Sequence, residues 1–379
     1  MTELEEAGVS DVVAEVRDSD GSRTVLPASS WDRCEPSGGS GWLGTGAHSR
    51  WLRVAVLGLV AVVLAVEVWA IAPHIEAAGD ALSHPHWGWL GIALWCELGS
   101  MVYFARVQRR MLFAGGVRLP LRRAVAVTFA ANAMSVTLPA GPVISTGYTF
   151  RRMRSWGASA PVITWGMLTS GVLSTLALTV IGAFGASLAG GADNVVVVAL
   201  EVVLVIAAGL ALRRLARRPD LLLRIGTWSL RRANAVLRRP ALAGQERVRE
   251  LLDELLLIRP RTRDWLLGLL FAGLNWILDL ICLIAACRAV GANGPTLAVA
   301  MVAYASGMAA SSLPLLPGGV GVVDGALLVA LTHGGLGLAE ATAGVLVYRI
   351  ISFVLVAAVG WIFWLVMYRR DRHRARAAS

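Results

Sequence analysis

The chain of 379 residues has no lysine, so all 35 of its basic residues are arginines. Charged residues make up only 16% of it, against about 25% in a typical soluble domain. Its four cysteines show no CxxC spacing and no paired framework, and packing is the expected role of the three that lie in apolar stretches. With 56% hydrophobic residues, this composition argues against a soluble domain and against a disordered chain. It predicts a polytopic membrane protein.

Six apolar stretches are long enough to cross a bilayer, which takes about 20 helical residues. They run over 54–73, 87–105, 194–212 and 265–287, from about 161 within 155–192, and from about 341 to 368. We expect residues 1–50, which are polar and lack a periodic apolar face, to form a disordered cytoplasmic tail. A single transmembrane domain then covers 51–369, and a basic cytoplasmic tail covers 370–379.

Two further apolar stretches, 124–150 and 289–323, are interrupted by proline and glycine. The interrupting residues are Pro139 and Gly141 in the first stretch, and Pro317, Gly318, Gly319 and Gly321 in the second. Proline removes a backbone donor, and proline followed by glycine breaks a helix. Broken backbone survives at membrane depth only where protein buries it or a polar cavity hydrates it. We therefore expect two hairpins, each re-entrant or a pair of short helices.

The arginines predict the topology, because membrane proteins keep basic residues in their cytoplasmic loops. All but two of the 35 fall at the termini or in 106–123, 151–154 and 213–263. This distribution places both termini in the cytoplasm and orients the two hairpins oppositely. The arginine-rich loop 213–263 is then cytoplasmic, and we expect it to carry amphipathic surface helices on anionic lipid.

The two broken stretches also resemble each other. An offset of 178 residues pairs Leu138 with Leu316, and likewise Pro139 and Gly141 with Pro317 and Gly319, among ten identities over 44 positions. The predicted fold is thus an all-α membrane helical bundle of six spanning helices and two oppositely oriented broken hairpins, an inverted repeat. Such a pair of broken segments indicates a transport site at the repeat interface. The alternative is a duplicated packing element with no conduit.

Ionisable side chains inside a bilayer are costly unless paired or hydrated, so each is a functional candidate. Asp324 follows the second break, and Arg349 lies within the last predicted helix. Either they form an ion pair, which can be purely structural, or Arg349 binds a lipid phosphate with its planar fork. Asp279 lies mid-helix with Asn275 on the same face, and Glu97 lies mid-helix similarly. Each is either a proton or cation relay or a hydrogen-bonded packing group.

The glycines at the breaks allow either close approach of a headgroup or simple tight turns. Arg151 and Arg152 either attract anionic headgroups from the cytoplasmic leaflet or only anchor the topology.

The segment 313–326, LPLLPGGVGVVDGA, followed by Tyr348-Arg349, resembles the C-terminal signature of the lysylphosphatidylglycerol synthase transmembrane-region family, also called flippase-like. Asn132, the motif LPAGP at 138–142 and Arg151-Arg152 resemble its first motif, and the resemblance covers about 50–370. It implies a region that moves phospholipid between leaflets, whereas a separate domain of the larger members makes the lipid. We expect no synthase activity here. The family usually has Glu in place of Asp324 and often an acidic residue in place of Thr146.

The sequence thus predicts a transporter rather than an enzyme, in the bacterial cytoplasmic membrane, without a cofactor or metal site. It would move an anionic or zwitterionic lipid or amphiphile through a polar cavity between the hairpins by alternating access. The alternative is a non-transporting scaffold or regulator that binds lipid or a partner enzyme. Nucleic acid is not an expected partner, because no binding motif accompanies the positive charge.

Overall fold

The computed structural model describes residues 85–138, 140–190, 260–291, 294–311 and 321–377, besides two strands and a few single positions. The chain forms two compact units, Met1–Gly58 and Leu59–Ser379. In the first, β1 (Glu15–Arg17) pairs antiparallel with β2 (Arg23–Val25), where β-branched residues favour extended backbone. These strands fall within the predicted disordered tail, the rest of which lies outside the described residues. All the helices described below belong to the second unit.

Among the described residues, four helical segments are long and apolar enough to cross a membrane. They are α2 (Trp87–Ala114), α5 (Ala160–Ala189), α9 (Thr262–Ala289) and the continuous run from α12 (Leu338–Arg349) through a π-helical turn (Ile350–Leu355) into α13 (Val356–Ala377). At 28 residues, α2 and α9 are each about 42 Å long. Each segment covers one of the predicted crossings. The predicted crossings 54–73 and 194–212, and the predicted surface helices of the loop 213–263, lie outside the described residues.

Two pairs of short helices flank the predicted breaks, the helices of each pair pack against each other, and α11 lies almost entirely beyond the predicted stretch 289–323. The first pair is α3 (Leu121–Thr137) and α4 (Gly141–Arg154), and the second is α10 (Leu297–Ser311) and α11 (Val322–His333). The predicted interruptions are therefore present. Pro139, Pro317, Gly318 and Gly319 themselves lie outside the described residues.

The first break is sharp. Ala140 has a left-handed backbone with a φ of 55°, which is uncommon for a residue other than glycine. The next residue, Gly141, begins α4 directly against the last turn of α3. A Cβ atom on Gly141 would lie 2.0 Å from the carbonyl oxygen of Ser135, so only glycine fits this close approach.

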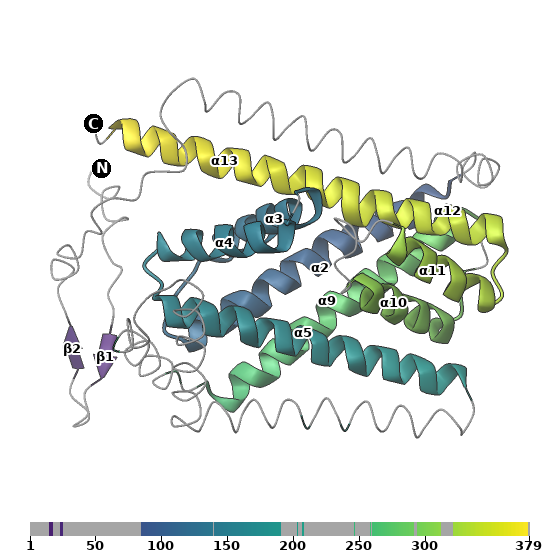
Figure 1. The fold of residues 1–379 in the computed structure, drawn as a ribbon, viewed down its shortest axis with the longest axis horizontal. Coiled ribbons are helices and arrows are strands. Elements are labelled where there is room, and N and C mark those ends of the chain that lie inside the picture. The colour runs from purple at the N-terminus through teal and green to yellow at the C-terminus, as the bar shows by residue number, and fades with distance from the viewer. Residues whose placement is uncertain are drawn as a thin grey trace, which may run out of the picture. The chain divides into compact units, whose positions relative to one another are not determined.

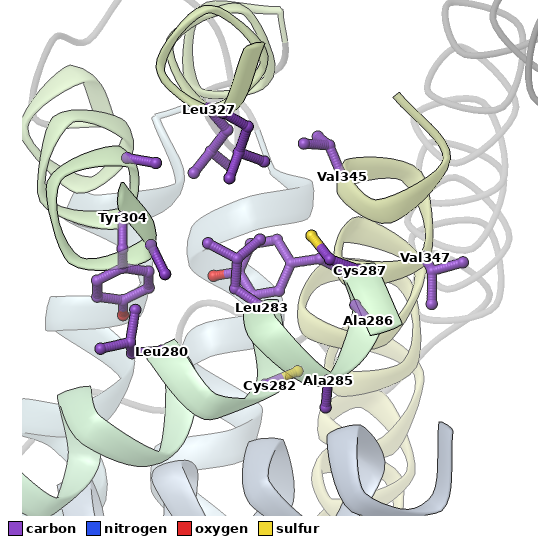
Figure 2. Close-up of a cluster of buried hydrophobic side chains, with 14 of the residues drawn as sticks. Leu280, Cys282, Leu283, Ala285, Ala286, Cys287, Tyr304, Leu327, Val345 and Val347 are labelled. Carbon is purple, nitrogen blue, oxygen red and sulfur yellow. The ribbon is translucent and has the colours of Figure 1, made fainter. Parts of the chain in front are cut away.

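The helices pack so that α9 lies at the centre of the described unit (Figure 1). It runs beside α2 over most of its length and also contacts α5, α10 and α12, while α13 packs along α3. Small residues allow close approach, as in other membrane proteins. Gly344 of α12, for example, faces Cys287 of α9. Figure 2 shows Tyr304 of α10, Leu327 of α11 and Val345 of α12 arranged around the side chains of α9.

Candidate functional site

An ion pair joins α11 to α12, the first part of the last long helical run. Asp324 lies in the first turn of α11, where its Oδ2 accepts a hydrogen bond from the backbone N–H of Gly321 at 2.9 Å. Arg349 ends α12, and its Nε donates to Oδ1 of Asp324 at 2.5 Å. The guanidinium also lies over the ring of Phe353, 5.6 Å from its centroid. Of the two options left open by the sequence, the structure has the ion pair.

The two partners of the Asp324–Arg349 pair differ in accessibility. The Arg349 side chain is 10% exposed, whereas 28% of the Asp324 side chain is accessible. Because an isolated charge is costly in a membrane, Asp324 stabilises the buried guanidinium. Asp324 is therefore the more accessible partner of the pair.

A second polar group lies on α9, at Asp279. Its Oδ2 accepts a hydrogen bond from the hydroxyl of Tyr304 on α10 at 2.7 Å, and its Oδ1 accepts one from Tyr348 on α12 at 2.9 Å. Both tyrosines are almost fully buried. Hydrogen bonds to a charged acceptor are stronger than neutral ones, so these two contacts stabilise the ionised carboxylate and hold three helices together.

Glu97 of α2 completes this group. It is 4% exposed, and its carboxyl lies within hydrogen-bonding reach of Asp279 and beside the thiol of Cys282. Its Oε2 has no hydrogen-bond donor among the described residues. Although the sequence indicated Glu97 and Asp279 separately, the structure brings them together. We refer to Glu97, Asp279, Tyr304 and Tyr348 as the Asp279 cluster.

The interface between α2 and α9 contains one more buried polar contact. The hydroxyl of Ser100 donates to Oδ1 of Asn275 at 3.1 Å, one turn from Glu97 and Asp279 on their respective helices. The prediction that Asn275 and Asp279 share a helix face is confirmed, since both face α2. The polar residues of the two helices thus form one continuous strip.

Helix α12 connects the two polar groups through consecutive residues. Tyr348 donates to Asp279, and Arg349 donates to Asp324. The π-helical turn Ile350–Leu355 follows immediately. Such wider turns are rare within helices and are frequent at functional sites. Helix α12 therefore supplies one residue to each polar group.

The other predicted residues lie on α3 and α4. Arg152 of α4 pairs with Asp371 of α13 at 2.5 Å, and its guanidinium lies over Trp156. Arg151 is exposed in the last turn of α4, and Asn132 is half-buried on α3. Among the contacts of the described residues, none joins these side chains to the Asp279 cluster or to the Asp324–Arg349 pair.

Tyr304 and Tyr348 are the candidates that sequence reasoning missed. Tyr348 entered only as part of a motif, and Tyr304 had no assigned role. A signal was available, because the chain has only five tyrosines and these two lie in apolar helices. A buried tyrosine hydroxyl usually finds a hydrogen-bond partner, and a carboxylate is a strong one.

The chemistry offered by these groups is the exchange of protons and the binding of small ions. The carboxyl groups of the Asp279 cluster can take up or release a proton, and a guanidinium can bind a carboxylate or a phosphate. Within the described helices, no three His, Cys, Asp or Glu side chains gather where they could hold a metal ion.

Comparison with known proteins places this chain in a family. Residues 50–360 match the family described as Lysylphosphatidylglycerol synthase TM region, a range that contains both polar groups. The chain is also similar to a UPF0104 membrane protein of Methanothermobacter thermautotrophicus (strain Delta H), with 33% identity over 93 residues. That match spans 24% of this chain and only 27% of the relative. The resemblance expected from the sequence motifs is confirmed, and the chain belongs to the lysylphosphatidylglycerol synthase transmembrane-region family of membrane proteins.

Proposed function

We propose that this protein moves an anionic or zwitterionic lipid or amphiphile between membrane leaflets, and that the Asp324–Arg349 pair binds its headgroup. The observation that carries the proposal is a buried arginine within a membrane-length helix, paired with a more exposed aspartate. Charged residues inside membrane helices are costly and mark the paths of substrates. The planar guanidinium fork fits phosphate as well as carboxylate. An arriving headgroup phosphate can therefore replace Asp324 as the partner of Arg349.

In this proposal the chain crosses a bacterial cytoplasmic membrane six times, and both termini are cytoplasmic. The pairs α3–α4 and α10–α11 are oppositely oriented re-entrant hairpins of an inverted repeat. Their short helices support this assignment, since the 15 residues of α10 span about 22 Å and the hydrocarbon core is about 30 Å thick. The headgroup passes between the hairpins by alternating access, and no bond of the lipid is broken. The protein is then a transporter and not an enzyme.

The remaining candidates act around the headgroup path. We assign Asn132, Arg151 and Arg152 to the cytoplasmic approach, because Arg151 and Arg152 place positive charge at the end of α4. Glu97 and Asp279 are assigned to the coupling of transport to an ion rather than to headgroup contact, because both oxygens of Asp279 already accept hydrogen bonds from tyrosine hydroxyls.

Leaflet exchange of a fluorescent phospholipid in reconstituted vesicles tests this proposal. The full chain is placed in vesicles of phosphatidylglycerol and phosphatidylcholine, and dithionite then bleaches only the label in the outer leaflet. We expect the protein to make the inner label accessible. We expect Arg349→Gln to slow this exchange at least about tenfold, because a hydrogen bond to a charged group contributes about 1.5–3 kcal/mol.

A matched control separates loss of headgroup binding from loss of charge. Arg288 is half-buried and, like Arg349, lies over an aromatic ring, that of Trp89 at 4.9 Å. We expect Arg288→Gln to exchange lipid at the rate of the unmodified protein. Circular dichroism shows whether Arg349→Gln keeps its helices. Exchange no faster than in protein-free vesicles refutes transport, and lipid found bound by mass spectrometry would then favour the scaffold alternative.

A further inference from the structure

The Asp279 cluster contains two carboxyl groups, and both of its hydroxyl donors serve the same one. The hydroxyls of Tyr304 and Tyr348 both donate to Asp279, one to each oxygen. Oε2 of Glu97 has no donor among the described residues, although the Glu97 side chain is almost completely buried. Its carboxyl nevertheless faces that of Asp279 within hydrogen-bonding reach. Two acceptors in contact need a hydrogen between them.

Electrostatic repulsion between the two carboxyl groups also requires a hydrogen between them. Two ionised carboxylates in contact at a buried site repel each other strongly, so one of them keeps a proton. Because two hydroxyls already stabilise the ionised form of Asp279, the proton belongs on Glu97, which then donates to Asp279. Among the described residues, the other titratable groups that face these two carboxyls are the thiols of Cys96 and Cys282 and the hydroxyls of the two tyrosines.

None of these neighbours takes the proton at neutral pH, since ordinary thiols and phenols are themselves protonated there. A metal cation fits the site less well. Such a cation takes several oxygen ligands, whereas both Asp279 oxygens already accept tyrosine hydrogens. The geometry therefore favours a proton as the ion bound between Glu97 and Asp279.

We propose that Glu97 and Asp279 form a proton-binding site, and that its loading is linked through α12 to the Asp324–Arg349 pair. When the proton leaves Glu97 for water, the two carboxylates repel each other and the position of Tyr348 changes. Arg349 is the next residue of the same helix, and the π-helical turn that follows gives the helix room to adjust. The link to the ion pair rests on the proposed transport function, but the proton site does not.

Infrared titration of the full chain in lipid nanodiscs tests the proton site directly. We expect the carbonyl band of a protonated carboxylic acid to persist at neutral pH and to shift in D₂O. Glu97→Gln should remove the band, and it should keep the fold because glutamine resembles protonated glutamate and can donate to Asp279. Glu340→Gln, which changes an exposed carboxyl of α12, should leave the band in place. Absence of the band in the unmodified protein, or its removal by sodium ions at constant pH, overturns the inference.

Leaflet exchange under a pH gradient tests the link. We expect the rate in the unmodified protein to change severalfold when the gradient is reversed, and Glu97→Gln to exchange lipid without responding to it. If the unmodified protein exchanges lipid at the same rate under both gradients, the link is refuted and the proposed transport function is unaffected. If no protein exchanges lipid, the proposed function and the link both fail, and the infrared titration still decides the proton site.

Discussion

The break between α3 and α4 allows a quantitative prediction at Gly141. An added Cβ atom would lie 2.0 Å from the carbonyl oxygen of Ser135 and 2.7 Å from that of Met134, whereas ordinary contacts begin near 3.4 Å. Overpacking a core costs about 1–3 kcal/mol where neighbours can move. Because both obstacles are backbone atoms, we expect Gly141→Ala to lose about 3 kcal/mol. That loss lowers the folding equilibrium constant more than about 100-fold.

The assay is unfolding by dodecyl sulfate in mixed micelles, followed by circular dichroism. Gly147 provides the matched control in the same helix, because a Cβ there meets nothing within 4 Å. We expect Gly147→Ala to be unchanged or more stable by up to about 1 kcal/mol, since alanine is favoured over glycine in helices. Equal stability of the two alanine variants would refute the close approach at Gly141.

Two further predictions use the same dodecyl sulfate unfolding assay. Gly360→Ala places a Cβ atom 2.2 Å from the carbonyl oxygen of Phe129, so it forces α13 away from α3, and we expect a loss of about 1–3 kcal/mol. Asp264→Ala removes a buried carboxylate that accepts from the backbone N–H of Arg261 at 2.8 Å and pairs with Arg110 at 2.5 Å. We expect it to cost about 1–3 kcal/mol, because a helix cap and a largely buried ion pair are lost together.

Each of these has an internal control. Gly273→Ala, on α9, adds a Cβ that meets nothing within 4 Å, and it should leave stability nearly unchanged. Asp371→Ala breaks the pair with Arg152, but 49% of the Asp371 side chain is exposed. We expect it to cost less than about 1 kcal/mol. If Asp371→Ala costs as much as Asp264→Ala, burial is not what makes the Asp264 pair important.

The helices could largely be predicted because their signals are local. Apolar runs of sufficient length predicted α2, α5, α9 and the last helix, and Pro161 correctly indicated the start of α5 at Ala160. The sequence underestimated lengths at charged ends. The second predicted crossing stops at residue 105, whereas α2 continues through Arg106 and Arg110 to Ala114. Arginine is a good helix former, so charge ends an apolar run without ending the helix.

The candidate site was only partly predictable. Asp324, Arg349, Asp279 and Glu97 were each recognisable as ionisable groups in apolar segments, because such groups are costly in a bilayer. The sequence did not indicate which of these groups contact each other. Asp324 and Arg349 are separated by most of two helices, and no local pattern specifies their pairing.

The sequence by itself determined the membrane class, the four described membrane-length helices and the two breaks, because hydropathy and the backbone chemistry of proline and glycine act locally. Only the tertiary structure decided that Glu97 lies against Asp279, and that Tyr304 and Tyr348 hold the same carboxylate. The physical reason is that these four side chains come from α2, α9, α10 and α12. Only the packing of those helices around α9 brings them to one buried point, where every polar atom needs a partner.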